Sequence, residues 1–296
     1  MKRTVLWLCI LLAWVTAPLQ AHIKKPLKVL ASFSILGDMV KSIGKEQVDV
    51  AVLVGPNSDA HTYEPAPQDA KALVNADLIL INGLGFEGWI TRLIEASRPH
   101  APIICVTDDL KPLIYASDGK TPDPHTWSSP RLGIVYIQAI QAALIRAAPE
   151  HKAVFAVNAK ALAQQLQDLD RWFTKEIGKV ASEQRIIVTS HSAFAYLCRD
   201  YGLTGHSLFG MDTNSQPSAK QVAGLIDLIR AHQLKGLFVE NITNVNLIEQ
   251  VAEETHVPVL GVVYSDALSN EEGPAATYVK LLTHNLQLIV SSWKKS

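Results

Sequence analysis

The segment 149–180 restricts the fold of this chain more than any other part of the sequence. It reads PEHKAVFAVNAKALAQQLQDLDRWFTKEIGKV, with a proline at its start, Gly178 near its end and neither residue type between them. Apolar residues recur along it at spacings of three and four, which is typical of one side of a helix. At 3.6 residues per turn it predicts one helix of about eight turns. The apolar side would hold Val154, Val157, Leu162, Leu166, Leu169 and Trp172 or Phe173.

Short apolar runs alternate with helical patterns on both sides of this segment. The connections between them are short, which is typical of parallel sheets flanked by helices. The predicted strands are 27–34, 48–54, 77–83 and 102–108 in the first half, and 185–190, 203–210, 234–241 and 258–265 in the second. The predicted helices are 35–46, 65–76, 89–97, 193–202, 218–232, 246–256 and 273–293.

These patterns predict an α/β fold with two lobes, each a mostly parallel sheet flanked by helices, joined by one long rigid helix. The N-terminal lobe would span 22–148, the connecting helix 149–180 and the C-terminal lobe 181–296. Flexible linkers are rich in Gly and Ser, unlike this connector. Two lobes on a stiff helix leave a cleft between them, and ligands of open α/β sheets bind at the carboxyl ends of strands.

Residues 1–21 read as a cleaved secretory signal. Lys2 and Arg3 precede the apolar run TVLWLCILLAWV, and small residues follow in TAPLQA, an order that is typical of signal peptides. The alternative, a membrane anchor, needs about 20 apolar residues, which is longer than this run. Cys9 lacks the small residues that precede a lipidated cysteine. We therefore expect cleavage near Ala21 and a soluble protein exported to the periplasm.

Charge and cysteine content narrow the possible partners. Removal of residues 1–21 leaves 25 basic and 28 acidic residues, a net charge of −3. No basic stripe indicates binding to nucleic acid, and we expect a monomer. Cys105 and Cys198 remain after cleavage. Export permits a disulfide, but both lie in apolar runs, which favours two buried free thiols.

Three histidines and one aspartate follow predicted strands or lie in loops. His61 follows the strand 48–54 and its loop, and His125 lies in the proline-flanked stretch TPDPHTWSSP. His191 and Asp266 come directly after the strands 185–190 and 258–265. Three imidazoles and one carboxylate can form a four-coordinate site that zinc accepts. A site in which the protein supplies every ligand is better suited to holding a metal than to catalysis.

Two glutamates are candidates for supporting roles. Glu240 follows the strand 234–241 closely enough to orient an imidazole through its second nitrogen, or else it is a helix cap or a surface charge. Glu64 is a candidate to support His61 or to contact a transport partner. We interpret the other seven histidines as structural or surface residues: His22, His100, His151, His206, His232, His256 and His284.

Common enzyme signatures are missing from the sequence. It contains no GxSxG, no HExxH and no P-loop, and its glycine pair in INGLGFEGW has the wrong spacing for a dinucleotide site. We therefore predict that the protein is not an enzyme. A secreted zinc hydrolase with three histidine ligands and a zinc-bound water is kept as an alternative, as is an adhesion or structural protein without stoichiometric metal.

The chain resembles the periplasmic zinc- and manganese-binding receptors, or solute-binding proteins, of metal ABC transporters, the cluster A-I family. The matching stretches follow the family's order over nearly the whole chain after residue 21. They are VLVGPNSDAHTYEPAPQDAKAL, ADLILINGLGFEGW, DPHTW, VTSHSAFAYLCRDYGL, FVENITNVNLIEQVAEET, VYSDALS and TYVKLLTHN. The resemblance implies two α/β lobes bridged by one long helix, a metal at their interface, and little closure of the lobes when metal binds.

The resemblance also implies the cargo and its ligands. The family's metal-ligand positions fall on His61, His125, His191 and Asp266. Relatives that favour manganese resemble one another in having Glu at the third position, so His191 implies Zn²⁺, although relatives with three His and one Asp take either metal. We therefore expect a receptor that delivers Zn²⁺ to the membrane permease of an ABC transporter. The alternative is a manganese or iron receptor.

The chain departs from the family pattern in the segment before His125. Many zinc relatives carry a long loop rich in His and acidic residues there, but this chain has only DDLKPLIYASDGKTPDPHTW. A metal-collecting function of that loop is therefore not expected. The continuation HTWSSP also differs from the family's usual apolar and acidic residues after the tryptophan.

Overall fold

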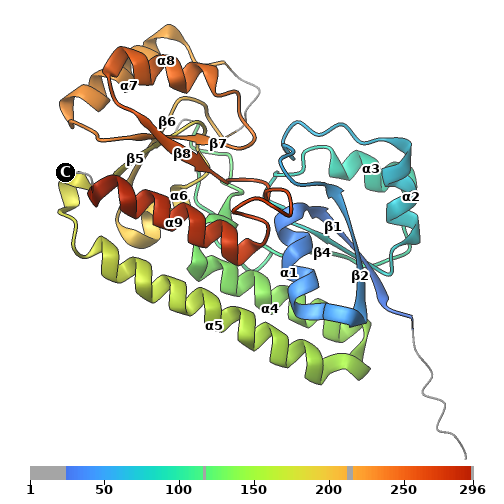
Figure 1. The fold of residues 1–296 in the computed structure, drawn as a ribbon. Helices are drawn as coiled ribbons and strands as arrows, with labels where there is room; N and C mark the ends of the chain where they lie inside the picture. Colours follow the sequence, from blue (N-terminus) through green and yellow to red (C-terminus); the bar gives the residue numbers. More distant parts are fainter. Residues whose placement is uncertain (1–24, 116–117, 212–215, 295–296) are drawn as a thin grey trace, which may run out of the picture.

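A computed structural model describes residues 25–115, 118–211 and 216–294. Figure 1 shows two lobes above a pair of long helices that run beneath both of them. The predicted signal peptide and its cleavage near Ala21 lie outside the described residues. Within the described ranges, no helix combines the length and apolar character that a membrane span requires.

Four parallel strands form the sheet of the N-terminal lobe. Their order is β2 (Val48–Val54), β1 (Leu27–Phe33), β3 (Leu78–Ile81) and β4 (Ile103–Cys105). The last five residues of β1 are buried, as expected for a central parallel strand covered on both faces. The helices that follow the first three strands are α1 (Ser34–Gly44), α2 (Pro67–Asn75) and α3 (Ile90–Ser97).

The parallel strands of the C-terminal lobe form two hydrogen-bonded pairs. One pair is β5 (Ile186–Thr189) with β6 (Thr204–Ser207), and the other is β7 (Leu237–Glu240) with β8 (Val259–Val263). Strands β5 and β7 lie side by side. At their carboxyl ends the hydroxyl of Ser190 accepts the backbone N–H of Glu240 at 3.3 Å. The helices of this lobe are α6 (Ala195–Tyr201), α7 (Ala219–Ala231), α8 (Asn246–Thr255) and α9 (Tyr278–Lys294).

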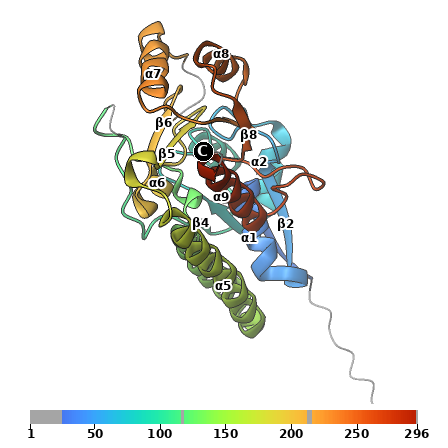
Figure 2. The same cartoon turned by 60° about the vertical axis from the view of Figure 1, so that its left-hand side comes forward.

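The long connecting helix is present as α5 (Lys152–Ile177), preceded by a 3-10 turn over Pro149–His151. Figure 2, turned by 60°, shows that it extends well beyond the strands. The predicted apolar side is correct from Leu162 onward, but Val154 and Val157 are 40% and 68% exposed. Phe155 and Ala159 are buried instead, because near its N-terminus the helix turns these positions toward its neighbours.

One helix was not predicted from the sequence. It is α4 (Pro130–Ala147), which packs along α5 and lies beside it in Figure 1. Its proline stands at the first helical position, where a missing N–H costs nothing. The segment is rich in β-branched residues, which lower helix propensity. Burial of Tyr136, Ile137, Ile140 and Leu144 outweighs that preference.

The last helix begins later than predicted. We placed its start at residue 273, whereas α9 begins at Tyr278. The carboxylate of Asp38, on α1, accepts the backbone N–H of Tyr278 at 2.8 Å. This bond satisfies one of the free N–H groups in the first turn of the helix. It also ties the start of α9 to the N-terminal lobe.

The buried apolar residues form two cores of unequal size. The larger core joins the N-terminal lobe to α4, α5, α6 and α9. The smaller core lies among β7, α7 and α8 and includes Val188 of β5. Strand alternation separates them on β7, because Phe238 belongs to the larger core while Leu237 and Val239 belong to the smaller one. The C-terminal strands are therefore a wall between the two cores.

Candidate metal centre

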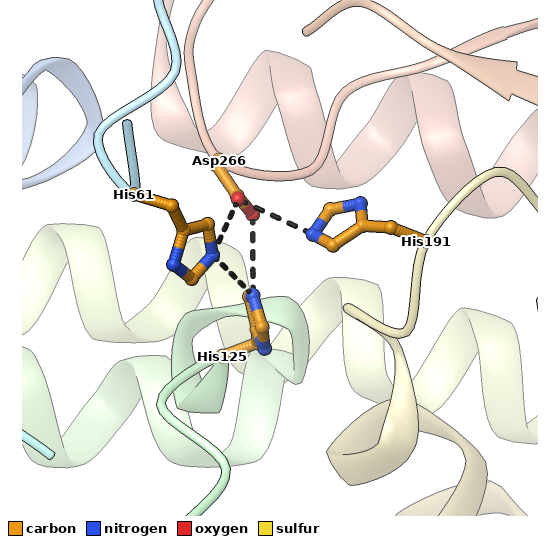
Figure 3. Close-up of side chains that lie close together, drawn as sticks. All are labelled: His61, His125, His191 and Asp266. Carbon is orange, nitrogen blue, oxygen red and sulfur yellow. Dashed lines mark hydrogen bonds and ion pairs between the residues drawn. The ribbon is translucent and has the colours of Figure 1, made fainter. Parts of the chain in front are cut away.

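Four side chains from distant parts of the chain converge at the carboxyl ends of the strands (Figure 3). His61 lies between β2 and α2, and His125 directly precedes the 3-10 turn Thr126–Ser128. His191 follows β5, and Asp266 follows β8. One possible ligand atom from each lies within 4.8 Å of the others. The structure thus brings together the four residues that the sequence singled out.

The carboxylate of Asp266 lies between the three imidazole rings. Its Oδ2 is 3.2 Å from Nε2 of His61 and 3.3 Å from Nε2 of His191, and its Oδ1 is 3.7 Å from Nε2 of His125. The Nε2 atoms of His61 and His125 are 3.1 Å apart. A tetrahedral ion with bonds of about 2.0–2.1 Å would hold its donors about 3.3–3.4 Å apart. The measured spacings match four donors around one small cation.

The carboxylate of Asp266 also lacks other polar partners. Among the described residues, neither of its oxygens makes a hydrogen bond of good geometry, and both are buried. A buried carboxylate without hydrogen bonds is costly in free energy. A cation placed between the imidazoles would stabilise it. The donor set therefore fits a bound divalent metal.

Burial and charge distinguish His61 from the other members of the site. His125, His191 and Asp266 are fully buried, whereas the His61 side chain is 9% exposed. Burial lowers the pKa of His191, but the charges of Glu240 and Asp266 raise it by more, so that its pKa lies well above the ordinary value. Burial raises the pKa of Asp266, but His191 and His125 lower it by more, so that its pKa lies well below the ordinary value.

An aspartate two residues upstream supports each histidine of the N-terminal lobe. Oδ1 of Asp123 accepts the backbone N–H of His125 at 2.9 Å and lies 2.8 Å from its ring Nδ1. Oδ1 of Asp59 accepts the backbone N–H of His61 at 2.8 Å. We did not predict either aspartate to have a role. The signal was available in the repeated pattern Asp-x-His, in DAH and DPH.

Glu240 supports His191 from a neighbouring strand. Its Oε1 accepts the backbone N–H of His191 at 2.7 Å, and its Oε2 contacts ring Nδ1. Of the two roles that the sequence left open, the structure favours orientation of an imidazole. A carboxylate on the second nitrogen fixes the ring and raises its basicity as a ligand. The Glu64 side chain is exposed, and Asp59 bonds to His61 N instead.

The remaining histidines and cysteines lie apart from this cluster. His22 is outside the described residues. In the described part of the chain, the other histidines belong to no group of three or more possible metal ligands. His284, for example, contacts the carbonyl oxygen of Val262 at 2.8 Å. Cys105 and Cys198 are both free, with Cys198 buried and Cys105 half-buried, where we expected two buried thiols.

A cleft of about 500 Å³ reaches the site from the side of His61. It lies between the segment around Tyr115 and Thr121 in the first half of the chain and the loop around Phe209 in the second. Of the four clustered side chains, His61 is the one in its lining. His61 is also the partly exposed member, so this cleft connects the cluster with solvent.

Comparisons with known proteins agree with this geometry. Residues 29–292 match the family model described as zinc-uptake complex component A, periplasmic. The manganese-binding lipoprotein MntA of Bacillus subtilis is 34% identical over 275 residues, which cover 90% of each chain. The iron-binding protein YfeA of Yersinia pestis is 32% identical over 91% of this chain and 87% of its own.

A solved structure supports the same relationship. The periplasmic zinc-binding protein TroA from Treponema pallidum superimposes with a TM-score of 0.85 at 28% identity. The match covers 90% of this chain and 99% of TroA. The expected α/β architecture with one long helix is confirmed by this match. The lobe boundaries at residues 148 and 180 stay predictions.

Proposed function

The chain belongs to the family of periplasmic metal-binding receptors of ABC uptake systems described as zinc-uptake component A, and we propose that it carries its metal on His61, His125, His191 and Asp266. The convergence of these four side chains, with donor spacings suited to one small ion, is the observation that supports the ligand set. Members of this family are transport components rather than enzymes, which argues against the zinc hydrolase alternative. The metal is the transported substrate.

We propose manganese or iron as the transported metal. The first curated relatives named above are a manganese-binding and an iron-binding protein, and each aligns over about nine-tenths of this chain. This proposal replaces our first expectation of zinc as the main cargo. The alignment over nearly the whole chain includes the segments that hold the four ligands.

Zinc is a second candidate, because the donor set favours it. Three imidazoles and one carboxylate are the nitrogen-rich combination that suits zinc, whereas manganese accepts more oxygen ligands. TroA, with the same fold, is named as a zinc-binding protein. Any such site binds Zn²⁺ more tightly than Mn²⁺ in a test tube, following the Irving–Williams order. Relative affinity alone therefore does not identify the cargo.

Two measurements together test this proposal. Competition titration of the metal-free protein should give one metal per chain, and the His61→Ala variant should bind more weakly. Cells that lack the protein should accumulate less radioactive manganese or iron, while zinc accumulation stays unchanged. A loss of zinc uptake alone would support the second candidate. A protein without stoichiometric metal would contradict both.

Delivery to the permease requires export and release. We propose that the predicted signal sends the protein to the periplasm, where a membrane permease of the ABC class receives the metal. Release through the cleft beside His61 needs displacement of that one ligand first, because the other three are fully buried. The His-rich collecting loop of some relatives is absent here.

A further inference from the structure

A shared feature links the four candidate ligands. The residue directly before each of them has its carbonyl oxygen held by a donor from another segment. Asn82 Nδ2 donates to Pro124 at 3.1 Å, before His125, and Trp89 Nε1 donates to Ala60 at 2.8 Å, before His61. The other two carbonyls are those of Ser190, held by the backbone N–H groups of Leu208 and Phe209 at 3.1 and 2.9 Å, and Ser265, held by Trp127 Nε1 at 2.7 Å.

The bond from Trp127 is the one that crosses between the two halves of the site. Trp127 stands two residues after His125, and Ser265 directly precedes Asp266. A single indole N–H therefore connects the loop of one ligand to the loop of another across 138 residues of sequence. The bonds to Ala60 and Pro124 stay within the N-terminal lobe, and those to Ser190 stay within the C-terminal lobe.

The indole of Trp127 is held tightly on all sides. It is fully buried and packs against Phe86 and Phe33 at centroid distances of 4.6 and 5.0 Å. The hydroxyl of Tyr278, at the start of α9, donates to the backbone carbonyl of Trp127 at 2.7 Å. Phe86 in turn contacts the ring of His61 at 4.8 Å. Movement of this indole would disturb more than one ligand.

The loop of Asp266 depends on such anchors because its carboxylate has none. In the described chain, no hydrogen bond of good geometry holds either oxygen. On the other side of Asp266, the hydroxyl of Ser34 accepts the N–H of Leu268 at 3.0 Å, and the N–H of Asn57 donates to the Leu268 carbonyl at 2.9 Å. These anchors belong to the N-terminal lobe. Asp266 therefore follows that lobe although it lies late in the sequence.

We propose that Trp127 is a positioning residue that holds Asp266 against the imidazoles of His61 and His125. This inference rests on the proposed metal-binding function. Loss of the indole N–H would leave the Ser265 carbonyl buried without its donor and free the loop to shift. A metal site whose one carboxylate is displaced binds more weakly, and supporting contacts of this type are typically worth 10–100-fold in metal affinity.

A double-mutant cycle tests this role. Trp127→Phe keeps an aromatic ring but removes the N–H donor, and it should weaken Zn²⁺ binding about 10-fold in a competition titration. In the Asp266→Ala background, where three imidazoles still hold Zn²⁺, the same change should have little effect. An equal loss in both backgrounds, or no loss in a folded Trp127→Phe protein, would overturn the proposal.

Two further variants make the test robust. Trp172→Phe removes a half-buried tryptophan on α5 and should leave affinity and the visible absorption of bound Co²⁺ unchanged, whereas Trp127→Phe should shift that spectrum. Tyr278→Phe keeps the indole but frees the Trp127 carbonyl, so its smaller loss should also vanish in the Asp266→Ala background. If Trp127→Phe does not fold, this second cycle decides. Failure of the wild-type protein to bind metal would instead contradict the proposed function.

Discussion

The two halves of the candidate site are held in different ways. His61, His125 and Asp266 stand on loops anchored to the larger core, two of them by tryptophan N–H groups. His191 stands at the end of β5, where its partner Glu240 comes from β7 and no regular ladder joins the two strands. The first half is built from many independent contacts, and the second depends on one buried acid. We therefore expect the second half to be more sensitive to a single change.

The largest expected effect follows from loss of Glu240. Glu240→Ala leaves the raised charge on His191 without its nearest partner in a fully buried position. Breaking a buried charge pair by removing one partner costs about 3–5 kcal/mol. Urea unfolding of the metal-free protein should show a loss of this size. A loss below about 1 kcal/mol would mean that β5 and β7 do not depend on this contact.

Loss of Asp123 should have a smaller and more selective effect. Asp123→Asn keeps an acceptor for the backbone of His125 but removes the charge beside its Nδ1. We expect about 10-fold weaker metal binding, with little change in the free energy of unfolding. Glu64→Gln, at an exposed carboxylate in the first half of the site, is the matched control and should change neither quantity. Equal behaviour of the two variants would remove Asp123 from the site.

Metal binding should release protons from the second half. Because the pKa of His191 lies well above its ordinary value, its ring is charged in the metal-free protein at neutral pH. A metal ligand must be neutral, so binding displaces this proton and affinity falls as the pH is lowered. Calorimetric titration in buffers of different ionisation enthalpy should reveal about one proton released per metal at pH 7. No dependence on buffer would contradict a charged His191.

The same raised pKa affects the stability of the metal-free protein. Because folding raises the pKa of His191, its contribution is fully present below the unfolded value of about 6.5. That contribution is lost as the pH rises through the folded value, which lies well above the ordinary one. Bound metal should remove this dependence. Unfolding measured across that pH range, with and without metal, checks the sign.

The smallest expected difference concerns motion. The smaller core involves α7 and α8, whereas the larger one unites the N-terminal lobe with α4, α5 and α9. Local opening is easier where fewer buried apolar contacts must be broken. Amide hydrogens in α7 and α8 should therefore exchange faster than those in α4 and α5. Uniform exchange over all four helices would show that the two cores unfold as one unit.

The sequence was most informative where a local pattern decided the structure. All eight strands lie within their predicted segments, and the long helix follows from the absence of Pro and Gly between its ends. The four clustered side chains were foreseeable because strand ends of parallel sheets meet at one edge. The burial of Val154 and Val157 was predicted wrongly, because periodicity alone does not show which neighbour a helix has.

Other features depend on contacts between distant segments. Nothing near Trp127 indicates that its N–H reaches Ser265, and nothing near Asp38 indicates that it binds the start of α9. The helix α4 was missed because tertiary packing overrides the low helix propensity of its β-branched residues. Asp266 was assigned to the C-terminal lobe by sequence, yet its loop is anchored to the N-terminal one. Such long-range bonds become visible only in the folded structure.

A crystal structure of the metal-loaded protein, with anomalous data collected at the absorption edge of the metal, tests the central claim most directly. We expect one strong anomalous peak bonded to the Nε2 atoms of His61, His125 and His191 and to Asp266, at distances of about 2.0–2.2 Å for Zn²⁺. A metal bound elsewhere, or bound here without one of these four side chains, would contradict the account.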